Sequence, residues 1–103
     1  MSAEAIRLDK WLWQARFCKS RTLASALVAE GRVRVNSGRV TRPARLILPG
    51  DVLTFPQGGV IRVVRVLAPG ARRGPAAEAR ELYEDLDPAA EGAGDGTMAA
   101  PLE

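Results

Sequence analysis

The sequence predicts an α+β fold built as one domain, and two observations carry that prediction. The first third of the chain holds two segments whose apolar residues recur at helical spacing, and the apolar period then changes from about 3.6 to about 2 residues. A length of 103 residues suits a single domain with a modest core. We therefore expect two packed helices followed by a small curled antiparallel sheet.

The two predicted helices follow each other closely. The first spans residues 7–16, and its one-sided apolar stripe consists of Leu8, Trp11, Leu12 and Ala15. The second spans residues 20–31, and its stripe consists of Leu23, Ala24, Leu27 and Val28. Ser20 is a good N-cap for the second helix, and Gly31 is a good stop signal. The short linker predicts that the helices bury their apolar sides against each other.

Period-2 segments bounded by turn residues predict the sheet. Val33 and Val35 alternate with polar residues, and Asn36-Ser37-Gly38 is typical of a tight turn. Strands are expected again at residues 46–48, 52–55 and 60–67, separated by turns at Pro49-Gly50-Asp51 and Gln57-Gly58-Gly59. The last two strands should form an antiparallel hairpin.

The C-terminal third changes in composition. Pro75 suits the first turn of a short helix that we expect to run to Leu86. From Asp87 onward the chain is mostly Ala, Gly, Pro and acid, which predicts disorder. The expected organisation is a flexible N-terminus at 1–5, a folded domain at 6–68, an extension with the short helix at 69–87 and a disordered acidic tail at 88–103.

The charges are separated along the chain. Residues 7–73 hold 14 basic and 3 acidic residues, whereas residues 74–103 hold 1 basic and 8 acidic residues. Such a basic segment attracts polyanions, either nucleic acid or an anionic membrane surface, and the acidic segment should compete with them. Neither an apolar run of about 18 residues nor a signal peptide is visible, so a membrane partner is not expected. The single cysteine, Cys18, fits the reducing cytoplasm, where we expect the protein.

The sequence offers little for catalysis. It has no histidine, and the basic segment holds only three acids, so no nucleophile with a base and no set of metal ligands is apparent. We interpret Cys18 as a small buried hydrophobe and Asp9 as a partner that orients a nearby arginine such as Arg16. No enzyme activity, no metal and no cofactor are expected.

Three groups of polar side chains are candidates for RNA contacts. At the start of the second helix, free backbone N–H groups and the helix dipole join Ser20, Arg21 and Thr22 in a favourable phosphate site. The outer side of the first helix and the linker after it contribute Arg7, Lys10, Gln14 and Lys19. Guanidinium groups bind phosphate and stack on bases, and the strand with its following loop supplies Arg32, Arg34, Asn36, Arg39 and Arg42.

Some of these residues have a purely structural alternative. In this alternative, Ser20 only caps its helix and Arg21 is merely solvated. Asn36 suits a turn better than an RNA contact. Trp13 points away from the apolar stripe, and two roles stand open for it: stacking on a base, or packing against the acidic C-terminal helix.

The segments RLDKWLW, KSRTLASALVAEGRVRVNSGRV and PGDVL, in this order, resemble the S4 RNA-binding domain. The stretches KWLWQARFCKSR and RRGPAAEARELYEDL are similar to the small ribosome-associated heat-shock S4 proteins. This resemblance implies an S4-type (αL) RNA-binding fold over residues 6–68. It also implies a non-catalytic protein that docks on structured RNA, namely large-subunit ribosomal RNA, as a stress or recycling factor. Longer members of that subfamily continue with a basic tail, whereas this chain turns acidic.

A function of another class is the alternative. In it, the C-terminal helix, with Leu82 and Tyr83, and the acidic tail form an adaptor for a protein partner, and RNA binding is incidental. For either function we expect a monomer without DNA specificity.

Overall fold

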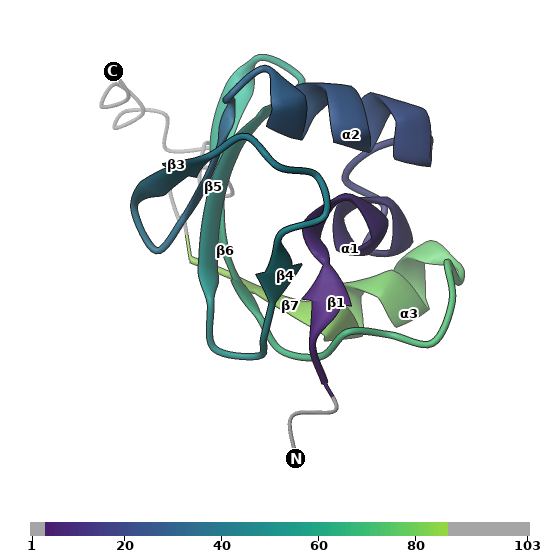
Figure 1. The fold of residues 1–103 in the computed structure, drawn as a ribbon. Helices are drawn as coiled ribbons and strands as arrows, with labels where there is room; N and C mark the ends of the chain where they lie inside the picture. The colour runs from purple at the N-terminus through teal and green to yellow at the C-terminus, as the bar shows by residue number, and fades with distance from the viewer. Residues whose placement is uncertain (1–3, 87–103) are drawn as a thin grey trace, which may run out of the picture.

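The computed structural model describes residues 4–86. Its elements in chain order are β1 (Ile6–Arg7), α1 (Leu8–Gln14), α2 (Arg21–Ala29), β2 (Val33–Val35), β3 (Gly38–Val40), β4 (Leu46–Ile47), β5 (Val52–Gln57), β6 (Val60–Val66), α3 (Ala76–Ala79), a 3-10 turn (Arg80–Leu82) and β7 (Tyr83–Asp85). Five strands form an antiparallel sheet in the order β3-β2-β5-β6-β7, and β1 pairs separately with β4. The helices lie to one side of the larger sheet (Figure 1). The α+β prediction, with two helices before a small antiparallel sheet, is confirmed.

The core fills the space between α1, α2 and the inner face of the sheet. Trp11, Leu12 and Val28 are fully buried from the helix side, and Leu53 and Val64 are fully buried from the sheet side. The Trp11 indole satisfies its N–H by donating to Ala68 O at 2.9 Å. Burial of this apolar surface is the main stabilising term for a domain of this size.

Helix α1 ends earlier than its apolar pattern predicts. Arg16 adopts a left-handed conformation with φ of 67°, and its N–H donates to Trp13 O at 3.0 Å. The next N–H, of Phe17, donates to Leu12 O at 2.9 Å. These two bonds are those of a Schellman C-cap, which terminates a helix at the residue before the left-handed one.

Helix α2 begins as the sequence predicts, with the Ser20 hydroxyl accepting the Leu23 N–H at 3.1 Å. The prediction that Leu23 belongs to the buried stripe is wrong, because its side chain is 54% exposed. The buried side of the helix is centred on Ala24 and Val28, one turn apart. Leu23 precedes Ala24 by about 100° of helical rotation and therefore turns outward.

The hairpins have the turns that the sequence predicts. Asn36 and Ser37, with φ of 51° and 77°, make a two-residue connection between β2 and β3. Gly58 and Gly59 make the corresponding connection between β5 and β6, also with positive φ at both positions. Two consecutive positive φ angles match the right-handed twist of a hairpin.

The C-terminal extension departs from the predicted helix. Helix α3 covers only Ala76–Ala79, and Tyr83–Asp85 pairs antiparallel with β6. The Leu82 carbonyl accepts the Leu67 N–H at 2.8 Å. The unpaired edge of β6 thus recruits the chain as a strand, in place of the helical bonds it would otherwise make. The predicted disordered tail at 88–103 lies outside the described residues.

Candidate nucleic-acid interface

A buried carboxylate joins the starts of the two long helices. Asp9 accepts two bonds from Arg7, at 3.1 and 3.0 Å, and one from the Ser25 hydroxyl at 2.8 Å. The Arg21 guanidinium lies 3.5 Å from the same carboxylate. Asp9 therefore holds Arg7 of β1 beside Arg21 of α2. The prediction that Asp9 orients an arginine is correct, but its partner is not Arg16.

The protonation of Asp9 follows from this arrangement. Burial by itself raises the pKa of the Asp9 carboxyl. The hydrogen bonds from Arg7 and Ser25 and the charges of Arg7 and Arg21 outweigh burial and lower that pKa below its usual value. Asp9 is therefore ionised at neutral pH and neutralises part of the charge that it gathers.

Strand β3 and the loop that follows it carry further arginines, and this loop lies beside the start of α1. Its backbone is fixed to the start of α1, because Leu8 N–H donates to Arg45 O at 2.8 Å and Asp9 N–H donates to Pro43 O at 3.2 Å. Arg39, Arg42 and Arg45 line a surface hollow of about 290 Å³, and no carboxylate of residues 4–86 lines it. Arg45 was not among the sequence candidates. We call the five side chains Arg7, Arg21, Arg39, Arg42 and Arg45 the arginine face.

The start of α2 places the other predicted phosphate ligands beside this face. Arg21 and Thr22 are exposed, and Ser20 caps the helix. The first N–H groups of a helix lack intrahelical partners and carry the positive end of its dipole, so they attract an anion. In the linker before α2, Lys19 is also exposed, whereas Lys10 of α1 is half-buried.

The arginines of β2 lie at the edge of this region. Arg34 stands opposite Arg39 across the β2–β3 pair and donates to Ser37 O at 3.3 Å. Arg32 lies 3.4 Å from Glu30, and both side chains are well exposed. Exposed pairs of this kind stabilise a fold very little, so Arg32 can exchange its partner for a phosphate.

Two predicted contact residues have structural roles instead. The prediction that Gln14 lies on the exposed side of the first helix is wrong, because Gln14 is 1% exposed. Its amide donates to Pro69 O at 3.0 Å and Gly70 O at 3.3 Å, which anchors the extension to α1. Asn36 donates to Asp51 at 3.0 Å and accepts the Val52 N–H at 3.0 Å, so its amide is engaged in the hairpin.

Trp13 contacts the extension through Arg73. The Arg73 guanidinium carbon lies 5.7 Å from the centre of the Trp13 ring, and Arg73 Nε donates to Trp13 O at 3.0 Å. Arg16, which we expected beside Asp9, also turns to the extension and donates to Gly74 O at 2.9 Å.

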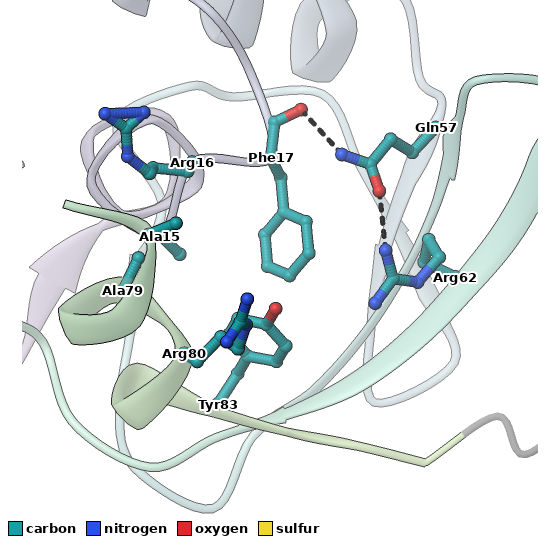
Figure 2. Close-up of a pocket in the computed structure, with 9 residues that line it drawn as sticks. Ala15, Arg16, Phe17, Gln57, Arg62, Ala79, Arg80 and Tyr83 are labelled. Carbon is teal, nitrogen blue, oxygen red and sulfur yellow. Dashed lines mark hydrogen bonds between the residues drawn. The ribbon is translucent and has the colours of Figure 1, made fainter. Parts of the chain in front are cut away.

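An aromatic cluster that the sequence did not indicate lies beyond the end of α1. The centroid of the Phe17 ring lies 4.9 Å from that of the Phe55 ring and 4.6 Å from that of the Tyr83 ring. Phe17 falls outside both helical stripes, so periodicity gave no signal for it. Figure 2 shows its ring facing a cavity whose lining is Ala15, Arg16, Phe17, Gln57, Arg62, Ala76, Ala79, Arg80 and Tyr83.

Within residues 4–86, no three His, Cys, Asp or Glu side chains lie close enough to bind a metal ion together. Burial raises the pKa of the half-buried Cys18 thiol, so this cysteine is poorly suited to nucleophilic chemistry. No helix in the described part of the chain is long and apolar enough to cross a membrane.

Comparison with known proteins agrees with this geometry. The S4 domain model matches residues 6–53. The chain is 43% identical over 83 residues to heat shock protein 15 of Escherichia coli K12, which covers 81% of this chain but only 62% of that relative. It is 38% identical over 61 residues to the RQC P-site tRNA stabilizing factor of Bacillus subtilis, covering 59% of this chain and 70% of that protein.

A solved trimeric structure of Vibrio cholerae heat shock protein 15 superposes on this fold with a TM-score of 0.81 and 33% sequence identity. The match covers 97% of this chain and 100% of that one. The chain thus spans less than two thirds of its E. coli relative but all of the solved one. It belongs to the family of S4-domain proteins that includes heat shock protein 15.

Proposed function

We propose that this protein is a non-catalytic RNA-binding protein that docks on the ribosome through the arginine face. One observation carries the proposal: Arg7 and Arg21 share a single buried carboxylate, Asp9, and the loop that carries Arg42 and Arg45 is hydrogen-bonded to the start of α1 and lines an arginine-rich hollow with Arg39. Like charges gather at a cost unless a polyanion neutralises them. Structured RNA supplies that polyanion, and guanidinium groups match its phosphates bidentately.

The contacts of this docking divide by element. Arg21, Thr22 and the first N–H groups of α2 bind one phosphate, and Arg39, Arg42 and Arg45 bind another. Lys10, Lys19, Arg32 and Arg34 extend the interface, and Trp13 presents its remaining surface to a base. One chain completes the arginine face, so a monomer suffices for docking, although the V. cholerae relative is trimeric in its crystal structure.

The ribosome is proposed as the site because of the relatives. A P-site tRNA, named for the B. subtilis relative, is bound to a ribosome. Within the ribosome we propose large-subunit RNA as the docking site, and action in the cytoplasm as a stress or recycling factor. The RNA-binding domain would comprise residues 6–68, braced by the extension, whose Leu82 is buried in the core.

The protein-adaptor alternative is less favoured by the geometry. It requires Leu82 and Tyr83 to be available to a partner. Leu82 is 8% exposed, and the Tyr83 ring packs on Phe17 within the same chain.

A matched pair of variants tests the proposal. Arg21 and Arg65 have side chains that are 42% and 43% exposed, and each lies near one carboxylate. We expect Arg21→Ala to weaken binding to a large-subunit RNA fragment at least about tenfold more than Arg65→Ala, which corresponds to about 1.4 kcal/mol. Equal losses in the two variants would contradict a localised docking site.

The salt dependence of binding provides a second measurement. If about six cations meet phosphates, the logarithm of affinity should fall with the logarithm of salt concentration with a slope of about −4 to −5. A flat response would show that the arginine face does not supply the affinity. Sedimentation of the tagged protein with purified large and small subunits tests which subunit it joins.

A further inference from the structure

The cavity beyond the end of α1 is built largely by residues that follow the S4 match, on the β5–β6 hairpin and the extension. It has a volume of about 190 Å³ and lies between the end of α1, the β5–β6 hairpin and α3 (Figure 2). Six of its nine lining residues follow residue 53, where the S4 match ends. The cavity is therefore a feature added to the S4 motif and separate from the arginine face.

Its lining combines cations with aromatic rings. Arg16, Arg62 and Arg80 line it beside Phe17 and Tyr83, and no carboxylate from the described part of the chain does. Arg62 is already engaged, because it donates to Gln57 at 2.6 Å and to Asp85 at 3.0 Å. Arg16 and Arg80 are exposed and make no ion pair within residues 4–86. Arg16 Nε donates to Gly74 O at 2.9 Å, so the two terminal amino groups of Arg16 and the guanidinium of Arg80 are open to an anion.

The backbone conformation at Arg16 also indicates a binding role for this region. Its φ of 67° places it where a helix end normally has glycine, and an arginine there is strained. Strained residues cluster at functional sites, where another role maintains them. The strained turn places the Phe17 ring at the cavity (Figure 2), and Arg16 itself is one of the residues that line it.

Size and position restrict the ligand. The cavity is smaller than the roughly 300 Å³ at which drug-sized sites begin, so it accepts a single small group. A base stacks on aromatic side chains, while its phosphate pairs with guanidinium groups. Phe17 precedes the Ser20 cap by three residues, so their Cα atoms lie within about 11 Å of each other. An RNA docked at the start of α2 can reach both places.

We propose that this cavity receives one unpaired nucleotide of the bound RNA. The base enters against Phe17 and Tyr83, and its phosphate remains at Arg16 and Arg80. The proposal rests on the proposed RNA-binding function, and it adds a single-nucleotide site that the S4 motif alone does not form.

Amide NMR spectra of the full chain, titrated with adenosine monophosphate and separately with inorganic phosphate, test the site. We expect the nucleotide to shift the amide signals of Ala15, Phe17, Gln57 and Ala79. Arg80→Ala and Arg16→Gly should each weaken this binding at least about fivefold, and glycine at position 16 also relieves the helix-end strain. Phosphate binding as tightly as the nucleotide, or shifts confined to the start of α2, would overturn the assignment.

Arg72→Ala is the matched control on the extension. The Arg72 side chain is 66% exposed, pairs with Glu78 at 2.7 Å and does not line the cavity. It should leave nucleotide binding unchanged. An equal loss of nucleotide binding in Arg72→Ala and Arg80→Ala would show that binding depends on net charge alone, and it would overturn the site. Melting temperatures of all variants confirm that each remains folded.

An RNA hairpin with one bulged nucleotide, compared with the same hairpin carrying an abasic bulge, separates this proposal from the docking proposal. The wild-type chain should prefer the intact bulge, and Arg80→Ala should lose that preference. No preference in the wild-type chain, together with the expected loss in Arg21→Ala, would overturn the nucleotide site and leave the docking site standing. No binding of any RNA by the wild-type chain would overturn both.

Discussion

The arginines of this protein fall into two regions that use the same side chain differently. On the sheet and extension, Arg62, Arg65 and Arg72 each lie within 3.0 Å of a carboxylate of the C-terminal segment, at Asp85, Glu84 and Glu78. On the arginine face, only Arg7 and Arg21 have a carboxylate partner among residues 4–86, and they share one, Asp9. Charge neutralised within the fold stabilises or orients it, whereas charge left open is available to a ligand.

This difference changes the meaning of the acidic segment. The sequence shows 8 acidic residues after position 73, and their sum suggests a competitor for RNA. Three of them instead pair with arginines of the sheet and extension. Of the other five, Glu81 lies in the extension, and Asp87, Glu91, Asp95 and Glu103 follow Leu86. These last four are the acids that we expect to compete with RNA for the arginine face.

The largest expected effect tests the structural region. Arg62→Ala removes a guanidinium that is 18% exposed, binds Gln57 and Asp85 and lies 5.3 Å from the Phe17 ring centre. Removing this largely buried guanidinium deletes its hydrogen bonds to Gln57 and Asp85, so the free energy of unfolding should fall by about 2 to 3 kcal/mol. Chemical denaturation measures this loss.

Arg65→Ala is the control for that change, because its pair with Glu84 is about half exposed. The free energy of unfolding should fall by less than about 1 kcal/mol. If both variants are equally stable, Arg62 is not a structural residue. The proposed division into structural and ligand-binding arginines would then be wrong for Arg62.

Local patterns predicted the helices and hairpins but not the contacts between distant segments. Ser20 as a cap and Asn36-Ser37 as a turn depend on neighbours within a few residues, so their chemistry is visible in the sequence. Gln14 seemed exposed because its partners, Pro69 and Gly70, are more than 50 residues away. The predicted helix through Leu86 failed for the same reason, since the edge of β6 determines the conformation of Tyr83–Asp85.

The candidate site shows the same limit. Arg21 was predicted from the helix start, whereas Arg45 was missed because only the β3–β4 loop brings it beside α1. Nothing in the spacing of Asp9 distinguishes Arg7 and Arg21 from Arg16 as its partners. That choice depends on where the chain turns after α1.

An intermediate effect is expected where a carboxylate organises the arginine face. Asp9→Asn keeps the shape but removes the charge that binds Arg7 and Arg21. We expect the free energy of unfolding to fall by about 2 kcal/mol near neutral pH, and RNA affinity to fall because both guanidinium groups lose their orientation. Unchanged stability together with unchanged affinity would show that Asp9 organises neither.

Acid should reproduce part of this effect in the wild-type protein. The pKa of Asp9 is lowered in the folded state, so its stabilisation is fully present above the unfolded value of about 3.9 and is lost as the pH falls through the folded pKa. In Asp9→Asn that part of the acid dependence should be missing. Denaturation curves of the two proteins between about pH 2 and 6 measure the difference.

The smallest expected effect concerns the four acids beyond Leu86 and is tested by truncation after that residue. A cut after Arg73 would also remove β7 and the buried Leu82, and it would confuse charge with folding. Exposed charges interact across about 30 Å at 0.01 M salt but only about 10 Å at 0.1 M. Truncation should therefore raise the affinity for random RNA about two- to threefold at the lower salt, and the gain should disappear at the higher.

A full-length variant with Asp87→Asn, Glu91→Gln, Asp95→Asn and Glu103→Gln separates charge from chain length. It should reproduce the gain of the truncated protein, because the acids act through their charge and not through a packed contact. A gain in the truncated protein alone would indicate that the segment excludes RNA by its bulk. A gain that persists at high salt would contradict long-range competition, since screening leaves only direct contacts intact. Competition of this kind acts on open cations. The four substitutions should therefore raise RNA affinity more when Arg21 is present than when they are combined with Arg21→Ala.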